Sequence, residues 1–193
     1  MEELPEELQR RKLYVEDAMG RIRNKNDRYR FKLMQVAVEF VGRLPISPLT
    51  TSIDYLRGFL PYPGVYLIYY VGTTSLYGNL VNPSQGRPIY IGMSRTDILD
   101  RLKNHRKKVE DAEDLDVRNF DVRFLIVDIE HFAPSIEAAL IEFYNPLWND
   151  KNVKFNFGNA ESDNNNWKKY HVDQNEYTRT DMIERVRKYY QER

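Results

Sequence analysis

Apolar residues recur at helical spacing in two stretches near the start of the chain. The first stretch, 28–43, is predicted to be a packed helix ended by Pro45, with Leu33, Val36, Ala37, Phe40, Val41 and Leu44 on its buried side. In the second stretch Ser47 is suited to the N-cap, Pro48 to the first helical position and Gly58 to the stop. We therefore expect two helices before residue 60.

The pattern changes to strands at Gly64. The run "GVYLIYYV" at 64–71 and the run "PIYIGM" at 88–93 are rich in Tyr, Val and Ile, which favour strands. The turn-rich segment "GTTSLYGNLVNPSQGR" separates them. A third strand is predicted within "VRNFDVRFLIVDI" at 117–129.

Two further helices alternate with these strands. Thr96 or Asp97 can cap a helix whose stripe holds Ile98, Leu102, His105 and Val109. Pro134 and Ser135 start another, ending at "NPLW", with Ile136, Ala139, Leu140 and Phe143 predicted to be buried. The order strand, strand, helix, strand, helix predicts an α+β fold with a small three-stranded antiparallel or mixed sheet flanked by helices. In the polar tail we expect a loop at 159–166 and a last helix at Thr180–Gln191.

Composition limits the class of protein. A chain of 193 residues is long enough to bury one sizeable core. Its apolar runs are far shorter than the roughly 20 residues that span a bilayer, so no membrane partner is expected. The acidic start "MEELPEELQRRKLY" has no apolar signal region, and there are no cysteines for disulfides or thiolate ligands. The cytoplasm is the expected compartment.

The formal net charge is zero, but the charges are grouped in blocks. Residues 21–32 carry six basic groups and one acid, and a second basic block lies between 91 and 108. These blocks are either solvated helix faces or contacts to nucleic acid. The candidate DNA contacts are Arg21, Arg23, Lys25, Arg28, Arg30, Arg95, Lys103, Arg106, Lys107 and Lys108.

Three side chains could carry chemistry. Arg101 and His105 are four residues apart, so they lie on one side of their helix, where Arg101 could hold two phosphate oxygens. Glu137 is the one acid in the apolar run "PSIEAALI". Taken singly, His105 could be a structural histidine, and Glu137 a charge favoured by the helix dipole.

Taken together, "GVY", "YIG", the arginine with a histidine four later, the glutamate and "PLWN" resemble the GIY-YIG nuclease family. The resemblance covers about residues 62–150 and implies that Tyr66 and Tyr90 face the scissile phosphate. It identifies Arg101 and His105 as catalytic, Glu137 as the metal ligand and Asn149 as the late asparagine of the site. The long insert and the stretches "TTSLYG", "NFGNA" and "NWKKYH" are most similar to the type II restriction endonuclease branch. Met93 stands where several members have a lysine that helps to deprotonate the attacking group.

A mechanism is implied for these residues. Tyr66, hydrogen-bonded to His105, would activate water if neighbouring cations lower its pKa from the usual value near 10. Arg101 would clamp the phosphate, Tyr90 would position water or a phosphate oxygen, and Asn149 would maintain the geometry. A single carboxylate fits one Mg²⁺ or Mn²⁺ ion per site better than two.

The resulting hypothesis is a metal-dependent, site-specific double-strand DNA endonuclease of the type II restriction class. Residues 1–61 would be a helical, DNA-gripping extension, 62–150 the nuclease core, and 151–193 an extension that packs on the core with possible DNA contact. A homodimer and a cognate DNA methyltransferase are the expected partners. A homing, repair or phage nuclease, and a non-cleaving DNA-binding module on the same fold, remain as alternatives.

Overall fold

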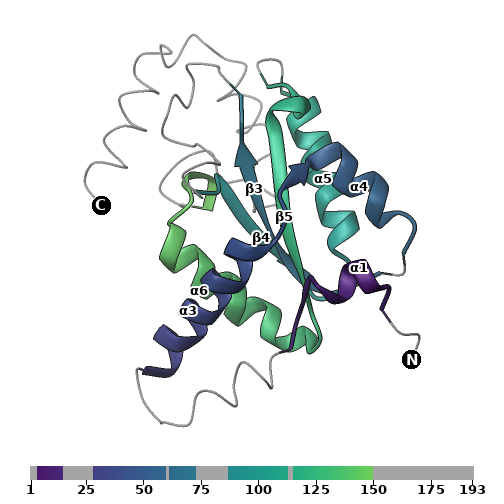
Figure 1. Ribbon diagram of the computed structural model, residues 1–193. Helices are drawn as coiled ribbons and strands as arrows, with labels where there is room; N and C mark the ends of the chain where they lie inside the picture. Colours follow the sequence, from purple (N-terminus) through teal and green to yellow (C-terminus); the bar gives the residue numbers. More distant parts are fainter. Residues whose placement is uncertain (1–3, 15–27, 60, 73–86, 113–114, 150–193) are drawn as a thin grey trace.

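The computed structural model describes residues 4–14, 28–59, 61–72, 87–112 and 115–149 (Figure 1). Within these ranges the three predicted strands are present as β3 (Gly64–Tyr70), β4 (Tyr90–Ser94) and β5 (Phe120–Val127). β3 lies in the middle and pairs antiparallel with both neighbours. The predicted α+β class and its central antiparallel sheet are confirmed.

The sheet has two more strands than predicted. The strands β1 (Lys12–Leu13) and β2 (Ser47–Pro48) both pair with β5, in parallel and antiparallel orientation respectively. The order is β1-β5-β3-β4, with β2 beside β5. Two residues are too few to show an alternating pattern, which is why the sequence did not reveal these strands. The N-terminal segment is therefore part of the sheet in addition to supplying helices.

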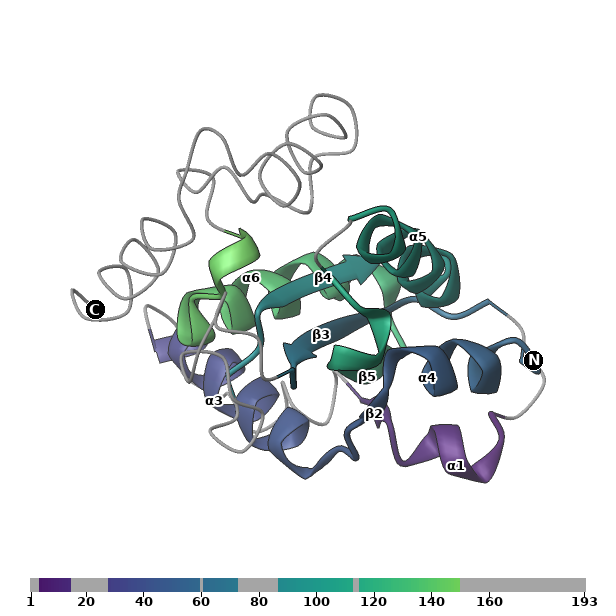
Figure 2. The same cartoon turned by 90° about the horizontal axis from the view of Figure 1, so that it is seen from above.

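Helices cover both faces of this sheet. They are α1 (Glu6–Gln9), α3 (Arg28–Arg43), α4 (Leu49–Leu56), α5 (Ile98–Glu110) and α6 (Ala133–Tyr144), with 3₁₀ turns η3 (Val117–Asn119), η4 (Glu130–Phe132) and η5 (Leu147–Asn149). Figure 2 shows α3 and α6 on one side of the strands, and α4 and α5 on the other. None of the described helices is long and apolar enough to cross a membrane.

Burial on both faces explains the composition of β3. All seven of its residues are buried. Tyr66 and Ile68 join the core under α4 and α5, whereas Val65, Leu67 and Tyr69 join the core shared with α3 and α6. A strand that is covered on both sides has no solvent face, so its sequence is a continuous apolar and aromatic run.

Two local predictions were wrong. Ser47 and Pro48 form β2 rather than the start of a helix, α4 begins at Leu49, and the Ser47 hydroxyl pairs with that of Ser52 at 2.8 Å. The strand forms because β5 offers unpaired backbone groups there. Phe143, predicted to be buried, is 51% exposed and packs edge-on against Tyr144. It lies in the last turn of α6 on the side away from the core, against which Ile141 and Tyr144 pack instead.

The remaining helix predictions agree with the structure where it describes the chain. Helix α3 spans the predicted residues, and Asp97 caps α5 by accepting a hydrogen bond from the Leu99 backbone N–H at 2.9 Å. Asn145 ends α6 in the left-handed conformation, which asparagine tolerates, with φ of 49°. The insert at 73–86, the loop at 159–166 and the helix at Thr180–Gln191 lie outside the described residues.

Candidate active site

The two motif tyrosines are brought together by the register of β3 and β4. Tyr66 lies opposite Gly92, and Ile68 lies opposite Tyr90, so both tyrosines are on the sheet face covered by α5. Their ring centroids are 6.3 Å apart. A Cβ atom at Gly92 would come within 2.5 Å of the Tyr66 hydroxyl oxygen. The glycine of "YIG" is therefore required to leave room for that hydroxyl.

His105 completes this cluster from α5. The Tyr66 hydroxyl and the His105 Nε2 are 2.6 Å apart in a buried hydrogen bond. The Tyr90 ring meets the imidazole edge-on, with centroids 4.9 Å apart. The apolar stripe of α5 holds His105 in place, because Leu102 and Val109 on the same stripe are fully buried. Sequence spacing thus predicted the face of α5 on which His105 lies, and the fold brought Tyr66 within hydrogen-bond distance of it.

Burial determines the protonation state of this pair. It lowers the pKa of His105 well below its usual value, and the nearby positive charges of Lys108 and Arg101 act in the same direction. Burial also raises the pKa of Tyr66 well above 10, supported by Tyr90 and opposed by Arg101. The pair is therefore neutral, and the tautomer of the imidazole sets which of the two atoms donates. The expectation that neighbouring cations lower the pKa of Tyr66 was wrong for the protein alone, because desolvation outweighs Arg101.

Glu137 approaches the same cluster from α6. It accepts a hydrogen bond from the Met93 backbone N–H, at the edge strand β4. Its pKa is raised to about 7 by desolvation, an effect that Arg101 and the Met93 hydrogen bond partly offset. Its charge also contributes to raising the pKa of Tyr90, after the larger effect of burial. A desolvated carboxylate beside neutral phenols is a position that a divalent cation would stabilise.

Glu137 would be a carboxylate ligand for such an ion. Among the described residues there is no group of three or more histidine, aspartate or glutamate side chains arranged to hold a metal. One carboxylate leaves most coordination positions to water and phosphate oxygens, which suits Mg²⁺. The residues present therefore fit a single, partly hydrated divalent ion.

Arg101 lies at the open side of the cluster. It is exposed on α5, one turn before His105, and lines a cavity of about 410 Å³ together with Met93, Arg95 and Asn104. The guanidinium can therefore reach a bound phosphate, whereas Tyr66 and His105 cannot reach bulk water. This combination of a buried proton pair, a carboxylate and an accessible arginine suits phosphoryl transfer.

A comparison with known families identifies the domain. The model of the Eco29kI GIY-YIG domain matches residues 59–187, more than half of the chain. The chain belongs to this GIY-YIG family. The fold agrees with it, and the domain is that of an endonuclease, a hydrolase that binds DNA. GIY-YIG nucleases generally use divalent metals. No curated protein matches the chain.

Asn149, the last motif residue of the GIY-YIG domain, binds the backbone of β4. Its Oδ1 accepts from the Ile91 N–H at 2.8 Å, and its Nδ2 donates to the Ile91 carbonyl at 2.7 Å. The Trp148 N–H adds a bond to the Ile89 carbonyl at 2.9 Å. η5 therefore closes the free edge of the strand that carries Tyr90 and Gly92. Because both ends of the amide are used on Ile91, Asn149 holds the backbone of β4 in place.

The candidate DNA contacts are only partly described. Arg21, Arg23 and Lys25 lie outside the described residues, and only the backbone of Arg28 and Arg30 is described. On α5, Lys103 pairs with Asp100 at 3.4 Å and Arg106 with Glu110 at 2.7 Å. Such exposed pairs within a helix are weak, so a phosphate can compete for these cations. Arg95 and Lys107 are exposed, and Lys108 is half-buried.

Sequence reasoning missed two contributors to the site. The Met93 backbone N–H holds Glu137, although this position was considered only for its side chain. Gly92 is needed for steric reasons, which are set by the strand opposite. A glycine within an otherwise β-branched and aromatic strand is the signal that could have identified it.

Proposed function

We propose that this GIY-YIG nuclease is a Mg²⁺-dependent, site-specific double-strand DNA endonuclease of the type II restriction class. The observation that carries the proposal is the buried Tyr66–His105 hydrogen bond of 2.6 Å beside Glu137 and Arg101. These residues supply a proton route, a metal ligand and a phosphate clamp. The family that matches over residues 59–187 supports the nuclease chemistry, and its name supports the restriction role.

In the proposed reaction, water attacks phosphorus while Tyr66 takes its proton. The Tyr66 hydroxyl proton passes at the same time to Nε2 of His105, along their 2.6 Å hydrogen bond. The bond from phosphorus to the leaving oxygen breaks, and that oxygen gains a proton from solvent. A charged His105 is disfavoured by burial and by Lys108, so Nε2 gives its proton back to Tyr66 while the Tyr66 hydroxyl releases one proton to solvent in the emptied site, which restores the neutral pair.

Charge on the phosphate is balanced from two sides. Arg101 neutralises the non-bridging oxygens, with a geometry suited to two of them. Tyr90 positions water or a phosphate oxygen, and Asn149 holds the strand on which Tyr90 sits. Glu137 would hold a divalent ion, which supplies charge stabilisation for the phosphate and the leaving oxygen when bound. Mg²⁺ is the proposed ion, with Mn²⁺ as a substitute.

Both strands of a duplex require two such sites. Each chain has one Glu137, and a two-fold symmetric homodimer on a palindromic sequence places one site at each strand. The basic helix α5 and the N-terminal extension would bind the DNA backbone. In this proposal residues 1–61 are that extension, residues 62–150 are the nuclease core, and residues 151–193 are a second extension. A cytoplasmic location and a cognate DNA methyltransferase complete the proposal, because a restriction enzyme must spare its own genome.

The deciding experiment is digestion of a mixed plasmid library with Mg²⁺, followed by sequencing of the ends. Discrete, repeated ends support the restriction role. Scattered or structure-dependent ends would instead favour a homing, repair or phage nuclease. A parallel digestion with EDTA should stop cutting, and DNA binding without any cutting in Mg²⁺ would favour a non-cleaving module.

The dimer is tested separately on supercoiled plasmid that carries one site. Wild-type chains are mixed with an excess of Glu137→Ala chains and allowed to exchange. Mixed dimers should leave nicked circles, because one competent site cuts one strand. A single chain that linearises the plasmid in one binding event would refute the dimer, and sedimentation of the complex counts the chains directly.

A further inference from the structure

The cavity beside the catalytic cluster extends beyond Arg101. Its volume is about 410 Å³, and it is formed by the turn after β4 and by the N-terminal half of α5. Residues three and four apart lie on one side of a helix, so the lining from this helix forms one continuous surface. It consists of Asp97, Asp100, Arg101 and Asn104.

The two carboxylates of this surface are engaged, whereas Arg101 and Asn104 are not. Asp97 accepts the capping hydrogen bond of α5 at 2.9 Å, and Asp100 pairs with Lys103 at 3.4 Å. Among the described residues, no hydrogen bond or ion pair engages the side chain of Arg101 or Asn104. Both side chains are exposed, so a ligand in the cavity can reach them.

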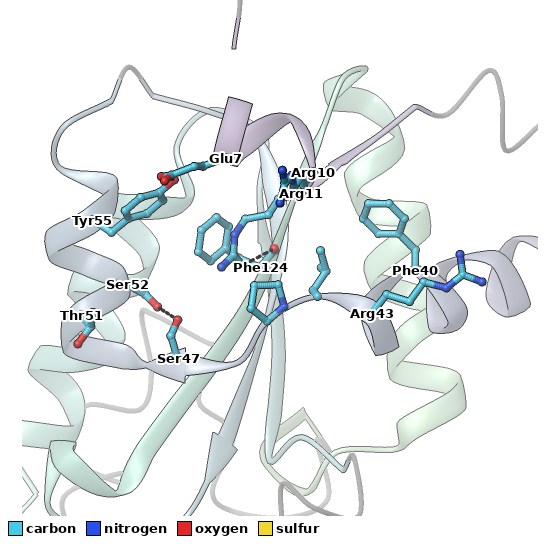
Figure 3. Close-up of a pocket in the computed structure, with 12 residues that line it drawn as sticks. Glu7, Arg10, Arg11, Phe40, Arg43, Ser47, Thr51, Ser52, Tyr55 and Phe124 are labelled. Atoms are coloured by element: carbon cyan, nitrogen blue, oxygen red, sulfur yellow. Dashed lines mark hydrogen bonds between the residues drawn. The ribbon is translucent and has the colours of Figure 1, made fainter. Parts of the chain in front are cut away.

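A larger cavity at the far edge of the sheet, of about 670 Å³, has no such arrangement. Figure 3 shows the guanidinium of Arg43 directed away from Arg10 and Arg11. Arg10 lies 3.5 Å from Glu6, and Arg11 lies over the ring of Phe124 and contacts its carbonyl. The cations of the larger cavity therefore do not converge on one ligand.

Asn104 lies between two parts of α5 that are proposed to contact DNA. It is one turn beyond Arg101, and Lys107 follows one turn beyond it. Side chains at this spacing have Cβ atoms about 5–6 Å apart. The phosphates of one DNA strand follow each other about every 3.4 Å along the axis. A side chain one turn from Arg101 can therefore reach a phosphate next to the one that Arg101 holds.

The amide side chain suits a phosphate in this position. Its Nδ2 can donate to a non-bridging oxygen, and its Oδ1 adds no negative charge to a surface that already holds Asp97 and Asp100. An asparagine can also read the edge of an adenine. Here the neighbouring Arg101 would hold the scissile phosphate, which places the sugar-phosphate backbone over this side of α5.

We propose that Asn104 is a substrate-binding residue whose amide donates to the phosphate next to the scissile one. The inference rests on the proposed function, because Arg101 sets where the scissile phosphate lies. A second held phosphate fixes the direction of the strand across the cavity. The strand then cannot rotate about Arg101, and the scissile bond stays beside Glu137.

The first test measures binding of a short DNA duplex in Ca²⁺, so it requires no cleavage. Asn104→Ala should weaken binding by about 10-fold, because a hydrogen bond to a charged phosphate is lost. Asn104→Asp keeps the shape of the side chain and adds a negative charge, so the loss should be larger, roughly 100-fold. Gln9→Glu is the matched control, because it makes the same chemical change at an exposed position of α1. Equal binding by Asn104→Asp and Gln9→Glu would overturn the proposal.

The dependence on salt separates this contact from a general loss of positive charge. Asn104→Ala removes no charge, so the slope of log affinity against log salt should stay at the wild-type value. A lower slope in Asn104→Ala would show that the substitution acts by displacing charged side chains, which would count against a direct contact.

The second test locates the contact on the DNA. The phosphates on either side of the cut position are replaced in turn by an uncharged methylphosphonate. If Asn104 contacts one of them, that replacement combined with Asn104→Ala should cost less than the product of the two separate effects. Independent effects at both phosphates, or a changed base preference in Asn104→Ala, would refute the phosphate contact.

The outcome for Asn104 is separable from the outcome for the restriction role. If Asn104→Asp binds DNA more weakly than Gln9→Glu but library digestion gives no discrete ends, the contact to DNA stands and the restriction role fails. If discrete ends appear and these two variants bind DNA equally, the reverse holds.

Discussion

The two edges of the sheet place polar groups in opposite environments. At the β4 edge, Tyr66, Tyr90 and His105 are buried, and burial shifts the pKa of each one away from its usual value. At the far edge, Arg10 and Arg43 are exposed around an open cavity. One edge is closed by Asn149, whereas the other has an unpaired stretch of β5.

The two environments suit different roles: buried groups suit proton transfer, and exposed cations suit the binding of phosphate. Proton transfer at a phosphate benefits from groups that are held rigidly and kept from water, because fields are stronger and need no reorganisation there. Holding a phosphate needs accessible cations whose solvation is lost only when the ligand arrives. Variants of the buried groups near β4 should therefore change rates, and variants of the exposed cations on α5 should change affinities.

The largest effect is expected for Glu137→Gln. Loss of the metal ligand should lower the cleavage rate by about 10³-fold, since a bound ion supplies several kcal/mol of charge stabilisation. The measurement is the initial rate of plasmid cleavage in Mg²⁺. Glu130→Gln, an exposed glutamate in η4, is the matched control and should cleave normally. Equal rates for the two variants would remove Glu137 from the reaction.

Tyr66→Phe and His105→Gln should each lower the cleavage rate by roughly 10²–10³-fold, a range typical of general acid-base groups. The two residues share one hydrogen bond, so the double variant should lose little more than either single variant. DNA affinity of all three is measured in Ca²⁺ and should stay unchanged. Multiplicative losses in the double variant would show that the residues act independently.

Asn149→Ala should destabilise the domain by about 1–3 kcal/mol, because it leaves the Ile91 backbone without its two partners. Denaturant unfolding measures this loss. The cleavage rate at saturating DNA should also fall, since β4 carries Tyr90, while DNA affinity should not change. An unchanged unfolding midpoint would contradict the positioning role.

The stability of the protein should depend on pH through Glu137. A carboxyl group with a folded pKa of about 7 binds its proton more tightly in the folded state than in the unfolded state. Ionising this carboxyl therefore costs the folded state free energy. The cost is absent below about pH 4.3, which is the pKa of an unperturbed glutamate. It grows as the pH rises and is complete above the folded pKa. Since part of the carboxyl is exposed to water, we expect this cost to be about 1 kcal/mol, which is less than the whole pKa shift would imply.

Glu137→Gln removes this penalty. The difference in melting temperature between the variant and the wild type should therefore be near zero at pH 4 and favour the variant at pH 8. Mg²⁺ should raise the melting temperature of the wild type alone at pH 8. A difference that does not change with pH would show that Glu137 keeps an ordinary pKa.

The smallest effect concerns salt. DNA affinity should fall as salt rises, because bound lysines and arginines release counterions. Lys107→Ala should lower the slope of log affinity against log salt by about 1, with no change in the cleavage rate at saturating DNA. Lys12→Ala, near the far edge, is the control. A DNA affinity of the wild type that does not change with salt would refute the contact between α5 and phosphate.

Several elements could be predicted from local pattern alone. The bounds of α3, the Asp97 cap of α5 and the stripe that buries His105 follow from spacing and capping chemistry. The two-residue strands β1 and β2 could not be predicted, because they exist only where β5 has an open edge. Phe143 was misassigned because periodicity fixes the direction of a helix face only approximately, and at this end of α6 Ile141 and Tyr144 face the core instead.

The sequence by itself determined the family and named the candidate site residues. The order of "GVY", "YIG", Arg101, His105, Glu137 and Asn149 identified them, and the match over residues 59–187 confirms the family. Their protonation states were decided by the tertiary structure alone. A pKa depends on how much water and charge surround a group, and residues distant in sequence provide that surrounding. Burial beneath α5 therefore keeps Tyr66 and His105 neutral, and packing of α6 against β4 brings the pKa of Glu137 to about 7.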